Sequence, residues 1–198
     1  NSLSGEAERE LGYAHYKKGN YQEAVIHLNK AIKIDPKLDN TRYKLGLIQK
    51  AMGNNDAAIE QFKENVKLFP NDAESYFELG VIYGKKALYS EAIENFKQVE
   101  KINPRHEKAL YNIGVAYYAK RDLKNSAEYY NKTLERNSKN KAAHKNLGAI
   151  YIEQKKYTKA IDHLNNYIRY ARGANDIDFI ELQVQRLQAN IADKYTLN

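Results

Sequence analysis

Glycine recurs at a fixed interval along this chain of 198 residues. Five of its ten glycines follow one another every 34 residues, at Gly12, Gly46, Gly80, Gly114 and Gly148. A period of this length indicates stacked structural repeats, because one unit of that size cannot bury its apolar face alone and must cover it with its neighbours. The spacing therefore predicts an array of repeats and not a single globular core.

Other residue types keep the same register, which we number from the repeat glycine. Position +12 is small, and position +16 is bulky, with Leu28, Phe62, Phe96, Tyr130 and Leu164. The only prolines, Pro36, Pro70 and Pro104, stand at position +24. Each marks a helix end, since the residue before a proline is disfavoured in helical geometry. A second break near Gly19 and Gly53 divides the unit into two helices, and Ala87, Arg121 and Lys155 hold the matching positions.

The pattern of L-G-x-x-Y, then A-x-x-x-F, then P within 34 residues resembles the tetratricopeptide repeat (TPR) family, over about residues 5–174. The resemblance implies an all-α, right-handed α-solenoid of helix-turn-helix repeats. The expected repeats cover residues 5–38, 39–72, 73–106, 107–140 and 141–174. Repeats four and five depart from the pattern at Ser126, Ser138, Tyr167 and Arg172.

Residues 175–198 are expected to form a further helix that caps the fifth repeat. A helix start is expected at Asn175 or Asp176 and an end near Tyr195. Its apolar residues form one stripe, made of Ile177, Ile180, Val184, Leu187 and Ile191. A terminal helix of this kind covers the exposed face of a repeat array. The alternative is a dimerisation helix, but two heptads fall short of the three or four that indicate a coiled coil.

The chemistry-bearing residues give no sign of catalysis. The chain contains no cysteine, no Gly-rich phosphate loop and none of the hydrolase or metalloprotease motifs. Five histidines are scattered without a pair at i and i+4: His15, His27, His106, His144 and His163. We interpret them as packing or surface residues. The sequence predicts a protein that is not an enzyme, with no cofactor and no metal site.

The compartment stays open. The chain has 42% apolar residues, but no apolar run approaches the roughly 18 residues of a membrane span. A soluble protein is expected, with the cytoplasm slightly favoured. The first expected helix begins near Asn1, which is also compatible with an exported mature form or with a domain excised from a longer chain.

The resemblance to TPR proteins points to one face of each first helix as a binding surface. At 100° per residue, positions −6, −3, −2, +1, +4 and +5 share one arc of that helix, which lines a concave groove in TPR proteins. The candidate groove residues are Tyr13, Tyr43, Lys44, Phe77, Glu78, Val81, Lys108, Tyr111, Asn112, Val115, Lys145 and Asn146.

Three of these residues occupy one register position in consecutive repeats. Tyr43, Phe77 and Tyr111 all stand at −3, which predicts an aromatic ladder that could grip an apolar helix or an extended peptide. The alternative is that the rings are structural and lie between adjacent hairpins. The sequence does not decide between the two.

Two kinds of partner are disfavoured. Chaperone-binding TPR domains grip a peptide carboxylate with Lys, Asn and Arg at set positions, and no frame of this chain matches more than one of them. The first frame instead offers Glu74 and Glu78. The net charge of +7 is concentrated in repeats four and five, which carry +3 and +5. A basic edge could meet nucleic acid or an anionic membrane, but no recognition motif accompanies it.

The function expected from the sequence is a protein-protein interaction scaffold that binds a peptide or helix in the groove. The alternatives are a module that forms homo-oligomers, or the TPR portion of a larger enzyme or secretion component.

Overall fold

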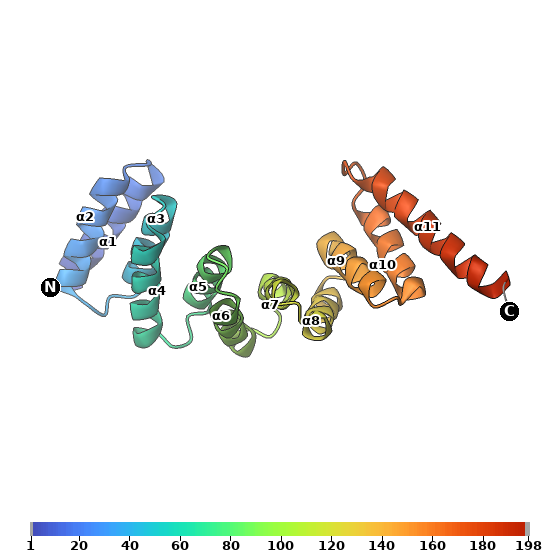
Figure 1. Cartoon of the computed structure of the whole chain (residues 1–198). Helices are drawn as coiled ribbons and strands as arrows, with labels where there is room; N and C mark the ends of the chain where they lie inside the picture. The colour runs from blue at the N-terminus through green and yellow to red at the C-terminus, as the bar shows by residue number, and fades with distance from the viewer. Residues whose placement is uncertain (1, 197–198) are drawn as a thin grey trace. The chain divides into compact units, whose positions relative to one another are not determined.

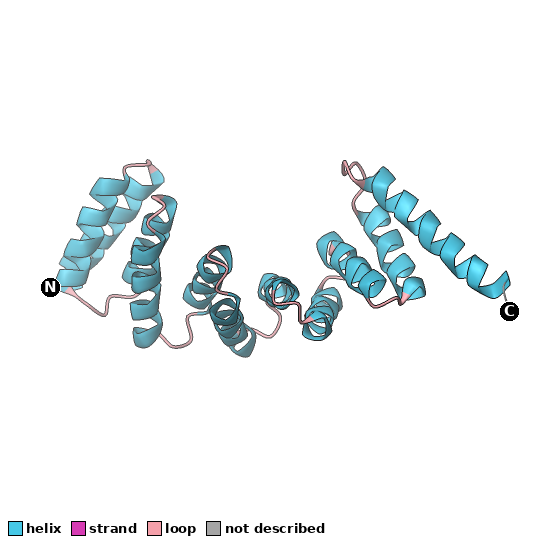
Figure 2. Ribbon diagram, in the orientation of Figure 1, coloured by secondary structure: helices cyan, strands magenta, loops and turns pink. Residues whose placement is uncertain are grey.

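The computed structural model describes the backbone of residues 2–196 and the side chains of residues 4–192. This part of the chain forms eleven α-helices and no strand (Figures 1 and 2). The helices are α1 Ser2–Lys17, α2 Tyr21–Ile34, α3 Thr41–Ala51, α4 Asn55–Leu68, α5 Ala73–Lys85, α6 Tyr89–Ile102, α7 Glu107–Ala119, α8 Leu123–Arg136, α9 Lys141–Glu153, α10 Tyr157–Tyr170 and α11 Ile177–Thr196. The expected all-α helical repeat fold is confirmed.

The chain divides into two compact units, and each is described by itself. Unit 1 runs to Pro104 and holds α1–α6, whereas unit 2 starts at Arg105 and holds α7–α11. In both units, consecutive helices pack as antiparallel pairs, α1 with α2 through α9 with α10. The repeat glycine lies in the first helix of every pair. The expected repeat boundaries remain predictions.

The repeat glycine sits where the two helices of a pair touch most closely. A methyl group placed on Gly80 would lie 2.6 Å from the ring of Phe96, at position +16 of the same pair. On Gly148 it would lie 2.5 Å from Leu164. No side-chain carbon fits at such distances, so the period of 34 residues reports a steric requirement between the two helices of each pair.

The turn inside each pair needs a left-handed backbone. Gly19 and Gly53 have φ near +80°, but Ala87, Arg121 and Lys155 occupy the same turn with φ of 59°, 63° and 56°. Residues with a Cβ atom lose roughly 1–2 kcal/mol in this conformation. The break predicted at these positions is confirmed, and three of the five turns are strained.

Glycine at two of the strained turns should stabilise the protein. We expect Ala87→Gly and Lys155→Gly each to raise the free energy of unfolding by about 0.5–1 kcal/mol in urea denaturation. Gly53→Ala is the matched control, because a methyl group there meets nothing within 4 Å and only the backbone conformation changes. It should lower the free energy of unfolding by a similar amount. Equal stabilities in all three variants would show that the turns carry no strain.

Helix α11 covers the last pair. Its side chains Ile180, Val184 and Leu187 are buried against a cluster that contains Leu164, Tyr167 and Ala171. This packing confirms the capping helix that the apolar stripe predicts. The opposite face of α11 leaves Phe179 59% exposed and Leu182 44% exposed. Residues 197 and 198, at the end of the expected capping segment, lie outside the described residues.

Candidate functional site

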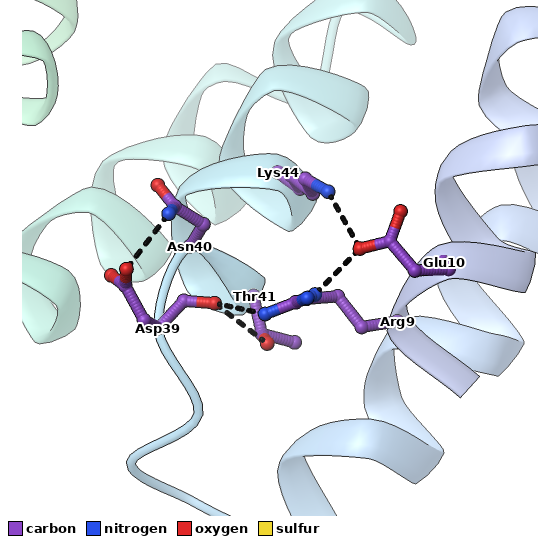
Figure 3. A network of polar contacts seen from close by, with 6 residues as sticks. All are labelled: Arg9, Glu10, Asp39, Asn40, Thr41 and Lys44. Carbon is purple, nitrogen blue, oxygen red and sulfur yellow. Dashed lines mark hydrogen bonds and ion pairs between the residues drawn. The ribbon is translucent and has the colours of Figure 1, made fainter. Parts of the chain in front are cut away.

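The first-helix surface is the face of α1, α3 and α5 in unit 1, and of α7 and α9 in unit 2, that carries positions −6, −3, −2, +1 and +4. In unit 1, charged side chains on neighbouring first helices pair with one another. Lys44 Nζ lies 3.4 Å from Glu10 Oε1, which Arg9 also contacts at 2.9 Å (Figure 3). Lys50 on α3 pairs with Glu78 on α5. The candidate residues Lys44 and Glu78 are therefore already engaged in ion pairs within the chain.

The Arg9 network also ties the loop before α3 to α1. Arg9 Nη1 donates a hydrogen bond to the carbonyl oxygen of Asp39 at 3.1 Å (Figure 3). The hydrogen bond from Arg9, followed by the charge of Lys44, lowers the pKa of Glu10. Since Glu10 is exposed, this pairing adds little stability.

Tyr13 is covered by cations of the same chain. Lys44 Nζ lies 4.2 Å from the centroid of the Tyr13 ring, and Lys17 Nζ lies 5.1 Å from it. Both are cation–π distances. The candidate residue Tyr13 therefore already has partners on its face.

The three residues of the predicted aromatic ladder each contact the ring at position +16 of their own pair. The ring centroids are 5.9 Å apart for Tyr43 and Phe62, 5.6 Å for Phe77 and Phe96, and 5.5 Å for Tyr111 and Tyr130. All three ladder rings are half-buried. Burial, followed by the charges of Glu74 and Glu78, raises the pKa of Tyr43 to about 12. The rings contribute to packing, and their ligand role stays a proposal.

In unit 2, side chains of α7 and of the turn after it contact side chains of α9. Asn146 Nδ2 on α9 donates to the hydroxyl of Tyr111 on α7 at 3.2 Å. Glu153 on α9 accepts a hydrogen bond from the Tyr118 hydroxyl at 3.0 Å and pairs with Arg121 at 3.0 Å. Partial burial and then the bond to Glu153 raise the pKa of Tyr118. The predicted residues Tyr111 and Asn146 thus lie together.

The candidate residue Lys145 is engaged at the start of the capping helix. Its Nζ lies 2.6 Å from Asp176 Oδ2, and Asp176 Oδ1 accepts a hydrogen bond from the Tyr167 hydroxyl at 2.5 Å. Hydrogen bonds from Lys145 and Tyr167 lower the pKa of Asp176. The hydrogen bond between Tyr167 and Asp176 raises the pKa of Tyr167 to about 12. Lys145 therefore ties the residue before α11 to α9.

Within the described part of the chain, three candidate residues on α7 make no side-chain hydrogen bond or ion pair. Lys108, Asn112 and Val115 are spaced by four and three residues, so they form one stripe along the helix. We call them the α7 stripe. Val115 is 39% exposed, Lys108 is exposed and Asn112 is half-buried. In unit 1, Val81 holds the position that Val115 holds here, and it is half-buried beside the paired Glu78.

The structure also brings together side chains that are far apart in the sequence. Positions −4 and +15 face each other across a helix pair: His27 Nδ1 lies 2.6 Å from Glu8, and His144 Nδ1 lies 3.0 Å from His163 Nδ1. Arg42 and Gln61 make the same contact at 3.3 Å. The signal was present in the register, since these residues share positions, but a separation of 19 residues is visible only once the hairpin is built.

The described residues contain neither a cluster of metal ligands nor a membrane-spanning helix. No three His, Asp or Glu side chains among them are placed to hold a metal ion. No helix in this part of the chain has both the length and the hydropathy needed to cross a membrane.

Family models match most of the chain. A model described as TPR repeat matches residues 12–53, 50–86 and 89–121. Two models described as tetratricopeptide repeat match residues 107–140 and 125–176. No protein of curated function matches the chain significantly in sequence.

Several solved structures share the fold. A crystal structure of MamA is 24% identical, with a TM-score of 0.77 over 81% of this chain and 94% of that chain. YrrB, described as a TPR protein with an unusual peptide-binding site, is 14% identical, with a TM-score of 0.76 over 90% of each chain. PilF of Pseudomonas aeruginosa is 19% identical, with a TM-score of 0.74 over 98% of this chain and 87% of that chain. At these identities the likeness concerns the fold alone.

Proposed function

The chain belongs to the tetratricopeptide repeat family, and we propose that it is a non-enzymatic scaffold that binds a segment of a partner protein on the first-helix surface of unit 2. The observation that carries this proposal is the α7 stripe. Elsewhere on the first-helix surface, the charged candidate residues are paired with side chains of the same chain. The α7 stripe instead offers an amine, an amide and an apolar side chain that are all open to a ligand.

The chemistry of the stripe fits a peptide. The amide of Asn112 can donate to a peptide carbonyl and accept from a peptide N–H at the same time. The exposed Val115 gives apolar contact one turn away, and Lys108 adds a cation at the edge. The Tyr111 hydroxyl, held by Asn146, lies on the same helix. Backbone hydrogen bonds with an apolar anchor beside them are the usual basis of peptide recognition.

Removal of one amide tests the proposal. Peptides selected from a random linear 12-residue library against the whole chain would be measured by isothermal titration with the wild type and with Asn112→Ala. We expect Asn112→Ala to weaken binding about tenfold, because it removes hydrogen bonds worth about 1–1.5 kcal/mol.

Asn131→Ala is the matched control, since Asn131 is an exposed asparagine on α8, the second helix of the same pair. It should change the affinity less than twofold. Circular dichroism melts of both variants would show that the fold is kept. If the two variants bind the selected peptides equally, the α7 stripe is not the binding surface.

Self-association is a second candidate function, and the exposed side chains of α11 favour it. Phe179 and Leu182 lie on the outer face of the capping helix, 59% and 44% exposed. A second copy of the chain would cover them. Sedimentation equilibrium at high micromolar concentration tests this candidate: a monomer throughout removes it, and a dimer that Phe179→Ser with Leu182→Ser abolishes supports it.

A further inference from the structure

The third helix pair differs from the first, second and fifth at the contact between positions −4 and +15; the fourth has Leu110 and Tyr129 there. Hydrogen bonds close this contact in the first, second and fifth pairs, through His27 with Glu8, Arg42 with Gln61, and His144 with His163. In the third pair the two positions are held by Tyr76 and Asn95. Asn95 Nδ2 donates back to the carbonyl oxygen of Glu91 at 2.8 Å and makes no bond to Tyr76. The contact is therefore open in this pair.

A hollow of about 360 Å³ lies at this open contact, within unit 1. Its lining includes Tyr76 and Tyr83 of α5, Glu91 and Glu94 of α6, and Lys63 of α4. Tyr76 and Tyr83 are seven residues apart, so they share one face of α5. The hollow and the first-helix surface use different faces of the helix, because Glu78 and Val81 lie on the other arc.

The side chains of the hollow have unmet bonding capacity. Tyr83 is only 9% exposed, yet its hydroxyl has no hydrogen-bond partner among the described residues. The carboxylates of Glu91 and Glu94 are exposed, and neither pairs with a cation in the described part of the chain. The Tyr83 hydroxyl itself is reached by solvent, so it is free to bond a ligand or water.

A positively charged side chain of the same chain already lies at the hollow. Lys63 Nζ lies over the ring of Tyr83, 5.8 Å from the centroid, at the outer limit of a cation–π contact. Two carboxylates against one ammonium leave the site with an excess negative charge. An apolar or anionic ligand is therefore disfavoured, and a cation is favoured.

We propose that this hollow binds an arginine side chain of a partner protein, at a site separate from the first-helix surface. A guanidinium is planar, so it can stack on the Tyr76 or Tyr83 ring while its N–H groups donate to Glu91, Glu94 and the Tyr83 hydroxyl. A lysine ammonium is a compact charge that is more strongly hydrated and cannot stack in this way. Lys63 competes weakly for the same ring.

Titration with blocked amino acids tests the proposal on the whole chain. The probe is N-acetyl-arginine methylamide, followed through the ring resonances of Tyr76 and Tyr83 by NMR. We expect saturable shifts with a dissociation constant on the order of 1–10 mM, as suits a single side chain. Glu94→Gln should weaken binding about fourfold, which is the Coulomb effect of one charge about 5 Å away in water. Lys63→Ala should tighten binding, because it removes the resident cation.

Two controls test whether the binding depends on this site and on the charge of the probe. Glu60 is exposed and holds the position in the second pair that Glu94 holds in the third, so Glu60→Gln should leave the affinity unchanged. N-acetyl-citrulline methylamide has the shape of arginine without its charge and should give no saturable shift. A citrulline response equal to that of arginine, or equal weakening by Glu60→Gln and Glu94→Gln, would overturn the proposal. A lysine probe that binds as tightly as arginine would overturn the choice of arginine.

Discussion

Gly80→Ala is expected to lower the free energy of unfolding by about 2–3 kcal/mol, whereas Gly84→Ala, one turn later on α5, is expected to raise it by about 0.5–1 kcal/mol. The two substitutions are chemically identical and lie on the same helix. Their opposite signs follow from what the added methyl group meets. At Gly80 it would lie 2.6 Å from the Phe96 ring, and at Gly84 it would lie 4.0 Å from the Ala92 side chain.

Gly80→Ala is destabilising because the added methyl group would push the two helices of the pair apart. Phe96 is 2% exposed and contacts Phe77, so its ring has no free direction in which to move. At Gly84 the contact is ordinary van der Waals distance, and the helix gains because alanine has a higher helix propensity than glycine. Urea denaturation of the two variants, beside the wild type, measures both effects.

A double-mutant cycle checks the physical reason. Phe96→Ala destabilises by itself, because it leaves a cavity in the core. In that background Gly80→Ala should cost less than about 1 kcal/mol, since the ring that opposes the methyl group is gone. If Gly80→Ala costs the same in both backgrounds, the clash with Phe96 is not its cause.

The repeat register allowed the fold to be predicted because its features are local or steric. A proline at +24 ends a helix, and glycine at the repeat position permits close approach of two helices, so both can be read from spacing alone. The departures in the later pairs could also be located, but not explained. Ser126 stands where other pairs have alanine, and its hydroxyl donates to the carbonyl oxygen of Gly114 at 2.8 Å. Tyr167 fills a small-residue position and bonds to Asp176.

The candidate site was harder to predict because it depends on which side chains satisfy each other. The sequence leads one to expect Lys44, Glu78 and Lys145 on the first-helix arc, and each is paired in the structure. A helical wheel at 100° per residue predicts the direction in which each side chain leaves its helix. It does not show which long side chains meet across neighbouring helices. The ladder residue Phe77 illustrates the same limit, since its ring contacts Phe96 of the second helix.

The histidine pair of the fifth repeat makes a second large effect predictable. His144 is 6% exposed, and its Nε2 lies 3.1 Å from the carbonyl oxygen of Ser138. That nitrogen must donate, so Nδ1 of neutral His144 is the acceptor of a hydrogen bond from His163 Nδ1–H at 3.0 Å. A second proton on His144 would place two N–H groups against each other. The hydrogen bond between the two rings therefore requires a neutral His144.

Burial lowers the pKa of His144, and burial together with the nearby charge of His144 lowers the pKa of His163 to about 4. Asp162 opposes this shift and Lys159 adds to it. The rings of Tyr170 and Tyr151 also contact the pair. In the unfolded chain both histidines titrate near 6.5. The unfolded state therefore binds more protons below that pH, and the stability that the neutral pair contributes is lost as the pH falls from about 6.5 towards 4.

We expect the wild type to lose about 1–2 kcal/mol more than His163→Gln between pH 7 and pH 5, a figure discounted for the partial exposure of His163. Glutamine stands at the equivalent position in the second pair, as Gln61, and its amide can still donate to His144 Nδ1. Carboxylates such as Asp176 titrate equally in both proteins, so the difference between the two urea-denaturation series isolates His163. Parallel pH dependences in the two proteins would show that His163 titrates alike in the folded and unfolded chains, and the packed neutral pair would then contribute nothing to stability.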